Sequence, residues 1–225
     1  MLLGACRSFH PDQMFMVGFN RRYSQLTERL QSLLHNRVAP LQVQYRVNAS
    51  FLPFDHWTQD PIVGGGRVIG EVCHFVDYLQ FVSGANPTEV FATAISGSLG
   101  KYKSDDNVAI TIALADGSVG TITYTALGTK TFSRERVELF WDESVAVIED
   151  FRVLEFARGS KKERHKLSSQ DMGYRKEMAE FIHGSAAVSQ MNLERAVATT
   201  NATFAILNSL KKRRPVKIQN IKGAR

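Results

Sequence analysis

The sequence predicts an α/β fold of the α+β kind, in which helices pack on one face of an open, mainly antiparallel β-sheet. Three observations predict it. Residues 24–39 and 67–83 carry apolar side chains at helical spacing, residues 88–156 alternate with a period of two, and two further helical patterns close the chain. With 225 residues, the chain is long enough to bury a sizeable core.

The first residues resemble the end of a doubly wound unit. Residues 2–6 could form a short helix, which His10 and Pro11 would break. The compact apolar run from Met14 to Phe19 is typical of a strand buried on both faces of a parallel sheet. A helix followed by such a strand is expected near the last unit of a doubly wound sheet.

A helix is predicted from Ser24 to just before Pro40. Ser24 can cap it, Thr27 occupies the place where a capping box would have Glu or Gln, and Glu28 puts negative charge in the first turn. Residues 41–50 then alternate between apolar and polar side chains, which indicates a half-exposed strand.

Residues 51–66 form a long irregular stretch that contains three consecutive glycines. Loops of this length inside a domain tend to be functional or disordered, and the aromatic side chains argue against disorder. The helix predicted at 67–83 ends at Gly84, which is placed as a C-cap glycine.

The remaining pattern is a strand series followed by two helices. Asp116-Gly117 predicts a hairpin between residues 108–114 and 119–124, and Asp142-Glu143 joins a second pair. One further strand is expected at 151–156 and an exposed basic stretch at 158–170. The predicted closing helices cover 173–183 and 193–212, the second with a buried stripe that consists of Ala196, Val197, Thr200, Phe204, Ala205, Leu207 and Leu210.

Charge and cysteines exclude some classes of function. The net charge is +6, but residues 211–225 contain seven basic and no acidic residues, so the rest of the chain is nearly neutral. No nucleic-acid motif accompanies this basic tail, and no apolar run reaches the roughly 20 residues of a membrane span, so we expect neither partner. Cys6 and Cys73 are far apart and form no metal-like cluster, which favours reduced thiols and no metal site.

The residues that could carry chemistry gather around one predicted helix. Glu71, His74 and Asp77 are spaced i, i+3 and i+6, so they share one side of it. A histidine near two carboxylates can have its pKa raised and its tautomer fixed, as a general acid or base requires. Alternatively, the three residues are simply a solvated helix face, and the preceding glycines a flexible entry to the helix.

Two motifs resemble the Gfo/Idh/MocA oxidoreductases, the glucose–fructose oxidoreductase and inositol dehydrogenase family. They are residues 16–24, Met-Val-Gly-Phe-Asn-Arg-Arg-Tyr-Ser, and residues 64–77, which run from Gly64-Gly-Gly-Arg to Cys-His-Phe-Val-Asp77. The resemblance implies a Rossmann domain that binds NAD or NADP, followed by an α/β domain whose sheet backs the substrate site and forms the oligomer interface. It covers essentially the whole chain, which begins at the last Rossmann elements.

The resemblance implies roles for individual residues. His74 matches the histidine that faces the substrate carbon being oxidised, and Asp77 matches a supporting acidic residue. The family commonly has an aspartate four residues before this histidine, where this chain has Gly70. Two alternatives follow. Glu71, the next residue, replaces that carboxylate, or this branch of the family contacts its substrate differently.

The resemblance also implies what this chain lacks. Neither the family's Gly-rich nucleotide loop nor its Glu-Lys-Pro segment occurs here, and the Gly64–Gly66 run does not follow a strand in a βαβ unit. Asn20, Arg21 and Arg22 follow the first strand and are candidates for cofactor contact, or else are surface residues paired with acids. We expect NAD or NADP in a complete enzyme but no cofactor bound by this chain alone.

The expected organisation has three parts: a Rossmann remnant at 1–23, a substrate-binding and oligomerisation domain at 24–215, and a basic tail at 216–225. The leading hypothesis is the substrate-side domain of a cytoplasmic dehydrogenase, which forms homo-oligomers through the sheet face, acts on a sugar or polyol hydroxyl and is inactive alone. The alternative is a non-catalytic oligomerisation module from a truncated gene product. The candidate substrate-binding residues are Tyr23, His56, Trp57, Gly65 and Arg67.

Overall fold

The computed structural model describes residues 15–98, 100–184 and 186–219, which form one sheet with helices against it. The sheet contains nine strands in the order β8-β7-β6-β5-β1-β4-β3-β2-β9. Within it, β1 and β4 pair in parallel, and every other pair is antiparallel. The predicted open, mainly antiparallel sheet is therefore confirmed.

The strands have these bounds: β1 Gln42–Asn48, β2 Pro87–Ala94, β3 Asn107–Leu114, β4 Val119–Thr125, β5 Glu135–Trp141, β6 Ser144–Glu149, β7 Val153–Arg158, β8 Lys161–Lys166 and β9 Val216–Lys217. The helices are α2 Gln25–Leu34, α3 Cys73–Ser83, α4 Tyr174–His183 and α5 Ala186–Lys212. Short turns of other helix types are η1 Asn20–Tyr23, η2 Trp57–Gln59, η3 Val68–Val72 and η4 Ser104–Asp106.

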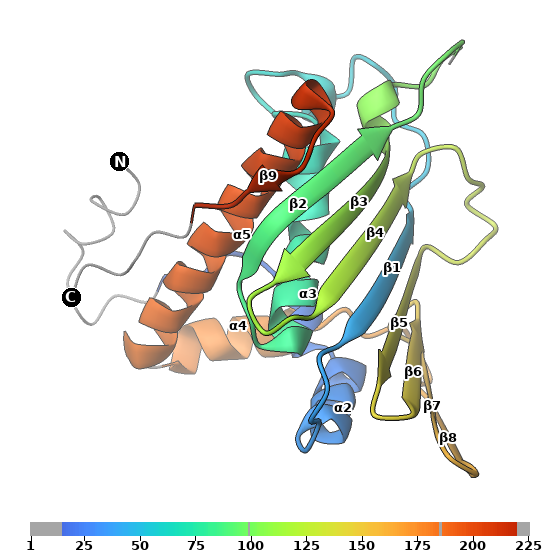
Figure 1. The fold of residues 1–225 in the computed structure, drawn as a ribbon, viewed down its shortest axis with the longest axis vertical. Coiled ribbons are helices and arrows are strands. Elements are labelled where there is room, and N and C mark those ends of the chain that lie inside the picture. The colour runs from blue at the N-terminus through green and yellow to red at the C-terminus, as the bar shows by residue number, and fades with distance from the viewer. Residues whose placement is uncertain (1–14, 99, 185, 220–225) are drawn as a thin grey trace.

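Helices α3 and α5 lie behind the sheet in Figure 1, so they cover one face and leave the other free. The core forms between them because alternate strand residues point toward the helices. Tyr45 of β1, for example, packs edge-on against Phe75 and Tyr78 of α3, and all three side chains are almost completely buried. This packing fixes α3, and with it His74, against the centre of the sheet.

Several turn predictions are confirmed because they follow from local chemistry. Ser24 accepts a hydrogen bond from the Thr27 backbone at the start of α2. Gly84 ends α3 in the left-handed region, with φ of 73°. The β3–β4 hairpin turns at Asp116-Gly117, and the β5–β6 hairpin turns at Asp142-Glu143, where both φ angles are positive.

The entry segment departs from the prediction. Residues 15–19 form no strand, and Val17 is exposed, because no neighbouring strand pairs with them within the residues described. Residue 14 and the short helix predicted at 2–6 lie outside the described residues.

Four other elements differ in detail from the prediction. The helix predicted at 67–83 is present, and its first part is a π-helical turn at Val68–Val72. Residues 161–166, in the predicted exposed basic stretch, are mostly exposed and pair with β7 as strand β8. Helix α5 begins before residue 193 and turns Phe204 outward, with 54% of it exposed, because Ala202, Ala205 and Ile206 face the sheet instead. Val216–Lys217, at the start of the predicted basic tail, pairs with β2.

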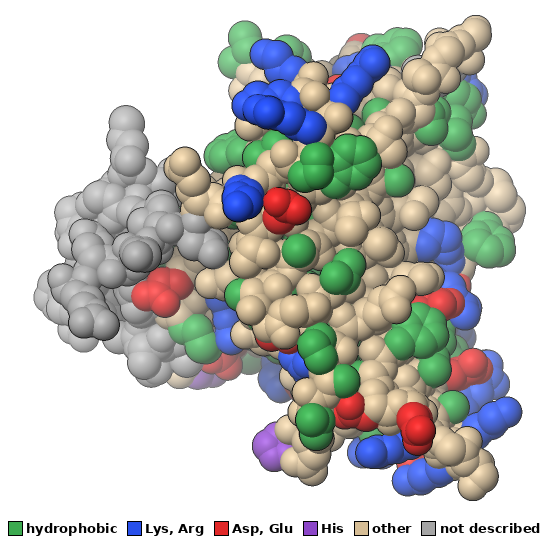
Figure 2. All heavy atoms as spheres, in the orientation of Figure 1, with side chains coloured by type: hydrophobic (Ala, Val, Ile, Leu, Met, Phe, Trp, Pro, Cys, Tyr) green, Lys and Arg blue, Asp and Glu red, His purple; other side chains and the backbone are tan. Residues whose placement is uncertain are grey.

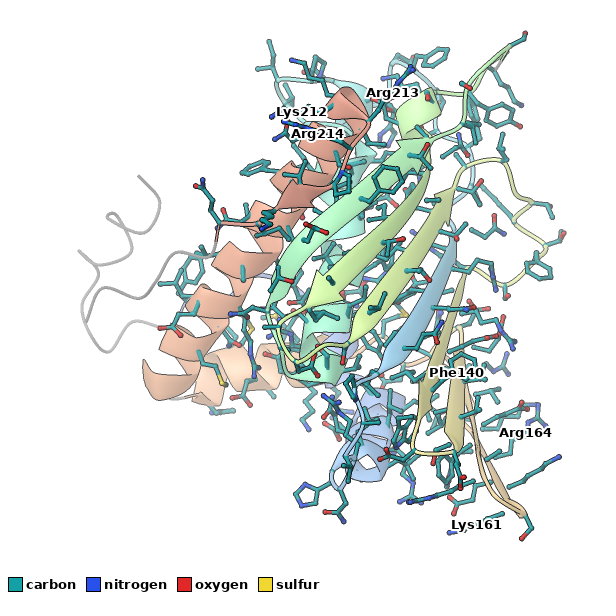
Figure 3. All side chains as sticks on the ribbon, viewed as in Figure 1. Phe140, Lys161, Arg164, Lys212, Arg213 and Arg214 are labelled. Atoms are coloured by element: carbon teal, nitrogen blue, oxygen red, sulfur yellow. The ribbon has the colours of Figure 1, made fainter. Side chains whose placement is uncertain are left out.

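Charged side chains gather at the two ends of the molecule. Figure 3 shows Lys212, Arg213 and Arg214 at the C-terminal end of α5, and Lys161 and Arg164 at the opposite end of the long axis. Over β2–β4, the helix-free face is mostly uncharged polar side chains and backbone, with scattered hydrophobic groups (Figure 2). None of the helices in the described part of the chain is both long enough and apolar enough to cross a membrane.

Candidate functional site

The π-helical turn at Val68–Val72 leads directly into α3 and positions the candidate residues. Gly70 and Glu71 lie within this turn, and His74 is the second residue of α3. Single π-helical turns are frequent at functional sites. Glu71 therefore belongs to the π-helical turn, and His74 belongs to the α-helix that follows it.

Arg67 ties the turn to the end of β1. Its guanidinium donates to both carboxylate oxygens of Glu71, at 2.9 and 3.3 Å, and to the backbone carbonyls of Ala49 and Ser50. It also stacks over the Tyr124 ring, with its carbon 5.1 Å from the ring centroid. Arg67 is 2% exposed, so it is a buried anchor that orients Glu71.

Asp77 makes a second, separate ion pair. Both of its oxygens accept hydrogen bonds from Arg22, and both side chains are buried. Arg22 also donates to Asn192 of α5. This pair fastens the segment before α2 to two helices and leaves Asp77 without a hydrogen bond to His74.

Arg21 forms a third pair, with Glu135 at the start of β5. It donates to the two carboxylate oxygens at 2.7 and 2.6 Å, and Tyr45 donates its hydroxyl to the same carboxylate at 2.6 Å. Burial works to raise the pKa of Glu135, but the hydrogen bonds and charge of Arg21 outweigh it and hold that pKa below its ordinary value. Glu135 is therefore an anion at neutral pH.

The predicted cofactor residues thus have internal partners. Asn20 donates to the backbone carbonyl of Met172, and Arg21 and Arg22 hold Glu135 and Asp77. All three are buried, so the alternative of surface residues was wrong, although the two arginines do pair with acids. Contact between any of them and a nicotinamide cofactor stays a prediction.

His74 is half-buried, and its ring packs edge-on against Phe19 at 5.6 Å. Burial, followed by the positive charge of Arg21, lowers the pKa of His74 to about 4. The expectation that neighbouring carboxylates raise this pKa was wrong, because burial and the charge of Arg21 outweigh the opposing effect of Glu135 and Glu71. His74 is neutral at pH 7, and its buried Nδ1 atom has no hydrogen-bond partner within the described residues.

The other candidates lie in the segment before the helix, which includes η2, or at the end of η1. Trp57 is 64% exposed, and the Nδ1 atom of His56 accepts from the Thr58 backbone. Gly65 has a φ of 70°, which favours glycine. Tyr23 is half-buried, which raises its pKa. Between these four side chains and His74, the described part of the structure records no direct contact.

Sequence reasoning missed Arg134 and Glu135. Arg134 follows an exposed loop and lies 3.6 Å from Glu71 and 3.8 Å from Glu135, measured between guanidinium nitrogens and carboxylate oxygens. Its side chain is 56% exposed. The pair Arg21–Glu135 is separated by 114 residues in sequence. No local pattern connects such residues, so only the fold brings them to the His74 helix.

Among the described residues, no strand leads through a Gly-rich turn into a helix, which is the unit that binds dinucleotides in Rossmann folds. The parallel pair β1–β4 is not part of a strand, Gly-rich turn and helix unit, and the glycines at 64–66 follow a loop. Among the residues described, no cluster of His, Cys, Asp and Glu could hold a metal ion. Burial raises the pKa of the Cys73 thiol to about 11, so the residue beside His74 is not an activated nucleophile.

The fold matches those of known oxidoreductases. Levoglucosan dehydrogenase in complex with NADH and levoglucosan is 18% identical, with a TM-score of 0.73, and the match covers 92% of this chain and 67% of that one. The NAD-binding oxidoreductase from Klebsiella pneumoniae is 16% identical, with a TM-score of 0.73, and the match covers 92% of this chain and 66% of that one. The aldose–aldose oxidoreductase from Caulobacter crescentus complexed with glycerol is 12% identical, with a TM-score of 0.74, and the match covers 91% of this chain and 64% of that one.

This chain therefore spans about two thirds of the length of those three proteins. No curated protein matches it by sequence. Residues 29–146, more than half of the chain, match the model of the GFO/IDH/MocA C-terminal domain. The chain belongs to the Gfo/Idh/MocA family of oxidoreductases, whose C-terminal domain it contains.

Proposed function

We propose that this chain is the substrate-side domain of an NAD(P)-dependent oxidoreductase that acts on a sugar or polyol hydroxyl. The observation that carries the proposal is His74, whose neutral ring has a buried Nδ1 atom with no internal partner and stands beside Glu71. A neutral imidazole can accept the proton of a substrate hydroxyl while the carbon that bears it is oxidised. The similar proteins that bind levoglucosan or glycerol support a polyhydroxylated substrate.

The residues around His74 have distinct roles in this proposal. Arg67 holds Glu71 in place, and Glu71 adds negative charge that favours the protonated form of His74. Arg21 opposes it and keeps the free imidazole neutral. Asp77 acts as a positioning residue because it anchors α3 through Arg22.

Sugar binding by the whole chain tests the role of His74. A panel of pyranoses and polyols is titrated into the wild type, His74→Ala and His165→Ala, with affinities measured by ligand-detected NMR. We expect His74→Ala to weaken binding about tenfold or more, and His165→Ala, on edge strand β8, to leave it unchanged. Unchanged binding by His74→Ala removes His74 from the account, and no binding to the wild type favours a non-catalytic oligomerisation module.

The nicotinamide cofactor supplies the hydride acceptor, and we propose that a separate nucleotide-binding domain holds it. The Gly64–Gly66 run before the helix follows a loop and not a strand, so the described residues offer no strand, Gly-rich turn and helix unit to receive its phosphates. We therefore expect no binding of NADH or NADPH to this chain up to about millimolar concentration. Micromolar binding in a fluorescence titration would contradict this expectation.

The helix-free sheet face is the surface we propose for homo-oligomer formation. Near β6–β8, it holds a groove of about 420 Å³ in which apolar Val145 and Val147 lie beside the charged Glu155 and Arg164. A two-fold interface brings the same patch of two copies together. Apolar side chains of one copy can then pack against those of the other, and acidic side chains can pair with basic ones. Sedimentation velocity should give a dimer or a larger assembly, and Val147→Asp should dissociate it.

A further inference from the structure

We infer that the sugar-like substrate carries an anionic group, a carboxylate or a phosphate, which binds the guanidinium of Arg134. This inference rests on the proposed function, because it assigns the substrate class of the same site. It starts from the three arginines around Glu71 and Glu135: Arg21, Arg67 and Arg134.

Two of these arginines are saturated by internal partners. Arg67 donates to Glu71 and to two backbone carbonyls, and Arg21 donates to both oxygens of Glu135. Asp106, which lies 3.9 Å from Arg67, accepts a hydrogen bond from Gln59. Each carboxylate of the cluster therefore has a closer partner than Arg134.

Arg134 keeps its hydrogen-bond donors available. Its contacts to Glu71 and Glu135, at 3.6 and 3.8 Å, are longer than hydrogen bonds, and the structure records no hydrogen bond from its guanidinium within the described residues. More than half of the side chain is exposed. A guanidinium in this state presents a rigid fork of N–H groups that matches a carboxylate or phosphate.

The backbone beneath Arg134 is held at several points, which makes the side chain a directed group. The Arg134 carbonyl accepts from the Asn48 backbone at 2.7 Å, and the Glu135 backbone donates to Asp150 at 2.8 Å. Arg46 donates to Ser133 on the other side. Anchoring on both sides limits the conformational freedom that binding a ligand would remove.

One buried polar atom of the same cluster also lacks a partner. The Nδ1 atom of His74 makes no hydrogen bond within the described residues, and the positive charge of Arg134 acts on this ring. Buried polar atoms normally have a protein or water partner, so Nδ1 is available to a substrate hydroxyl. A substrate with hydroxyls at one end and an anion at the other fits this arrangement.

Matched sets of sugars test the inference on the whole chain. D-glucose, D-glucuronate and D-glucose 6-phosphate, and the same three forms of galactose and mannose, are titrated by calorimetry into the wild type, Arg134→Gln, Arg134→Lys and Arg136→Gln. Arg136 lies two residues further along and pairs with Glu138 and Glu149 on the sheet, so its variant is the matched control.

We expect the wild type to bind one anionic form about tenfold more tightly than the neutral sugar, and Arg134→Gln to abolish that preference with the affinity for the neutral sugar unchanged. Arg134→Lys should restore part of it, and Arg136→Gln should behave as wild type. The carboxylate and phosphate arms identify which anion is recognised.

Equal affinity of the wild type for neutral and anionic forms overturns the inference, as does an anionic preference that survives in Arg134→Gln. Binding of neutral sugars that depends on His74 but shows no anionic preference leaves the proposed function standing while this inference fails. Absence of any sugar binding overturns both.

Discussion

Helix α3 and the turn before it carry two arginine–carboxylate pairs that differ in what surrounds them. The Arg22–Asp77 pair is closed, since the two side chains are 5% and 2% exposed and both oxygens are taken. The Arg67–Glu71 pair is open on one side, because Glu71 is 23% exposed and Arg134 approaches it without a hydrogen bond. The same chemistry therefore fastens the fold in the middle of α3 and is partly exposed to solvent in the turn before it.

The physical difference is desolvation. Moving two charges out of water costs several kcal/mol each, and a buried pair offsets this cost only while both partners are present. An exposed guanidinium has not lost its hydration, so it contributes little to folding and can exchange water for a ligand anion. Variants of the two pairs should separate these effects.

The largest effect is expected from Asp77→Ala. It leaves the Arg22 guanidinium buried without its carboxylate, so we expect the free energy of unfolding in urea to fall by about 3–5 kcal/mol. Glu28→Ala is the matched control because it breaks a pair with Lys176 in which the two side chains are 43% and 55% exposed. A control that costs as much as Asp77→Ala would contradict the comparison.

The pH dependence of stability should report His74. Its pKa in the folded chain is about 4, below the value of about 6.5 expected when unfolded, so the unfolded state binds the proton more tightly. The stability from neutral His74 is therefore fully present above pH ~6.5 and is lost as the pH falls toward ~4, by about 3 kcal/mol in all.

Urea unfolding of the wild type and of His74→Gln between pH 4 and 7.5 measures this difference. In His74→Gln, the free energy of unfolding should fall less steeply as the pH is lowered, because the contribution of His74 is gone. In His165→Gln, this contribution should remain. The same slope in the wild type and in His74→Gln would show that burial does not depress the pKa of His74.

The smallest effects are expected at the open pair. Glu71→Gln keeps a hydrogen-bond acceptor for Arg67, which also retains the carbonyls of Ala49 and Ser50, so we expect a loss of about 1 kcal/mol. Arg134→Gln should change stability by less than about 0.5 kcal/mol. Thermal unfolding of both variants beside Asp77→Ala tests the ranking, and a larger loss for Arg134→Gln than for Glu71→Gln would reverse it.

Local chemistry determined much of the fold in advance. The Ser24 cap, the Gly84 helix end and the Asp116-Gly117 hairpin each depend on a few adjacent residues, so the sequence predicts them correctly. The alternation of β1 likewise predicts its buried face, since side-chain direction in a strand follows from the backbone. The helix carrying His74 was predicted for the same reason, from its apolar stripe.

Only the tertiary structure decided the environment of that helix. The spacing of Glu71, His74 and Asp77 predicted one shared polar face, but Arg67 and Arg22 pair with the two carboxylates. Burial and the charge of Arg21 keep the His74 ring neutral. Arg22 lies 55 residues from Asp77 in sequence, and Arg21 lies 114 from Glu135. Ion pairs over such separations depend on how strands and helices pack, and a pKa depends on the desolvation and charges that this packing creates. Sequence therefore identified which residues could do chemistry, and the fold determined their partners and charge.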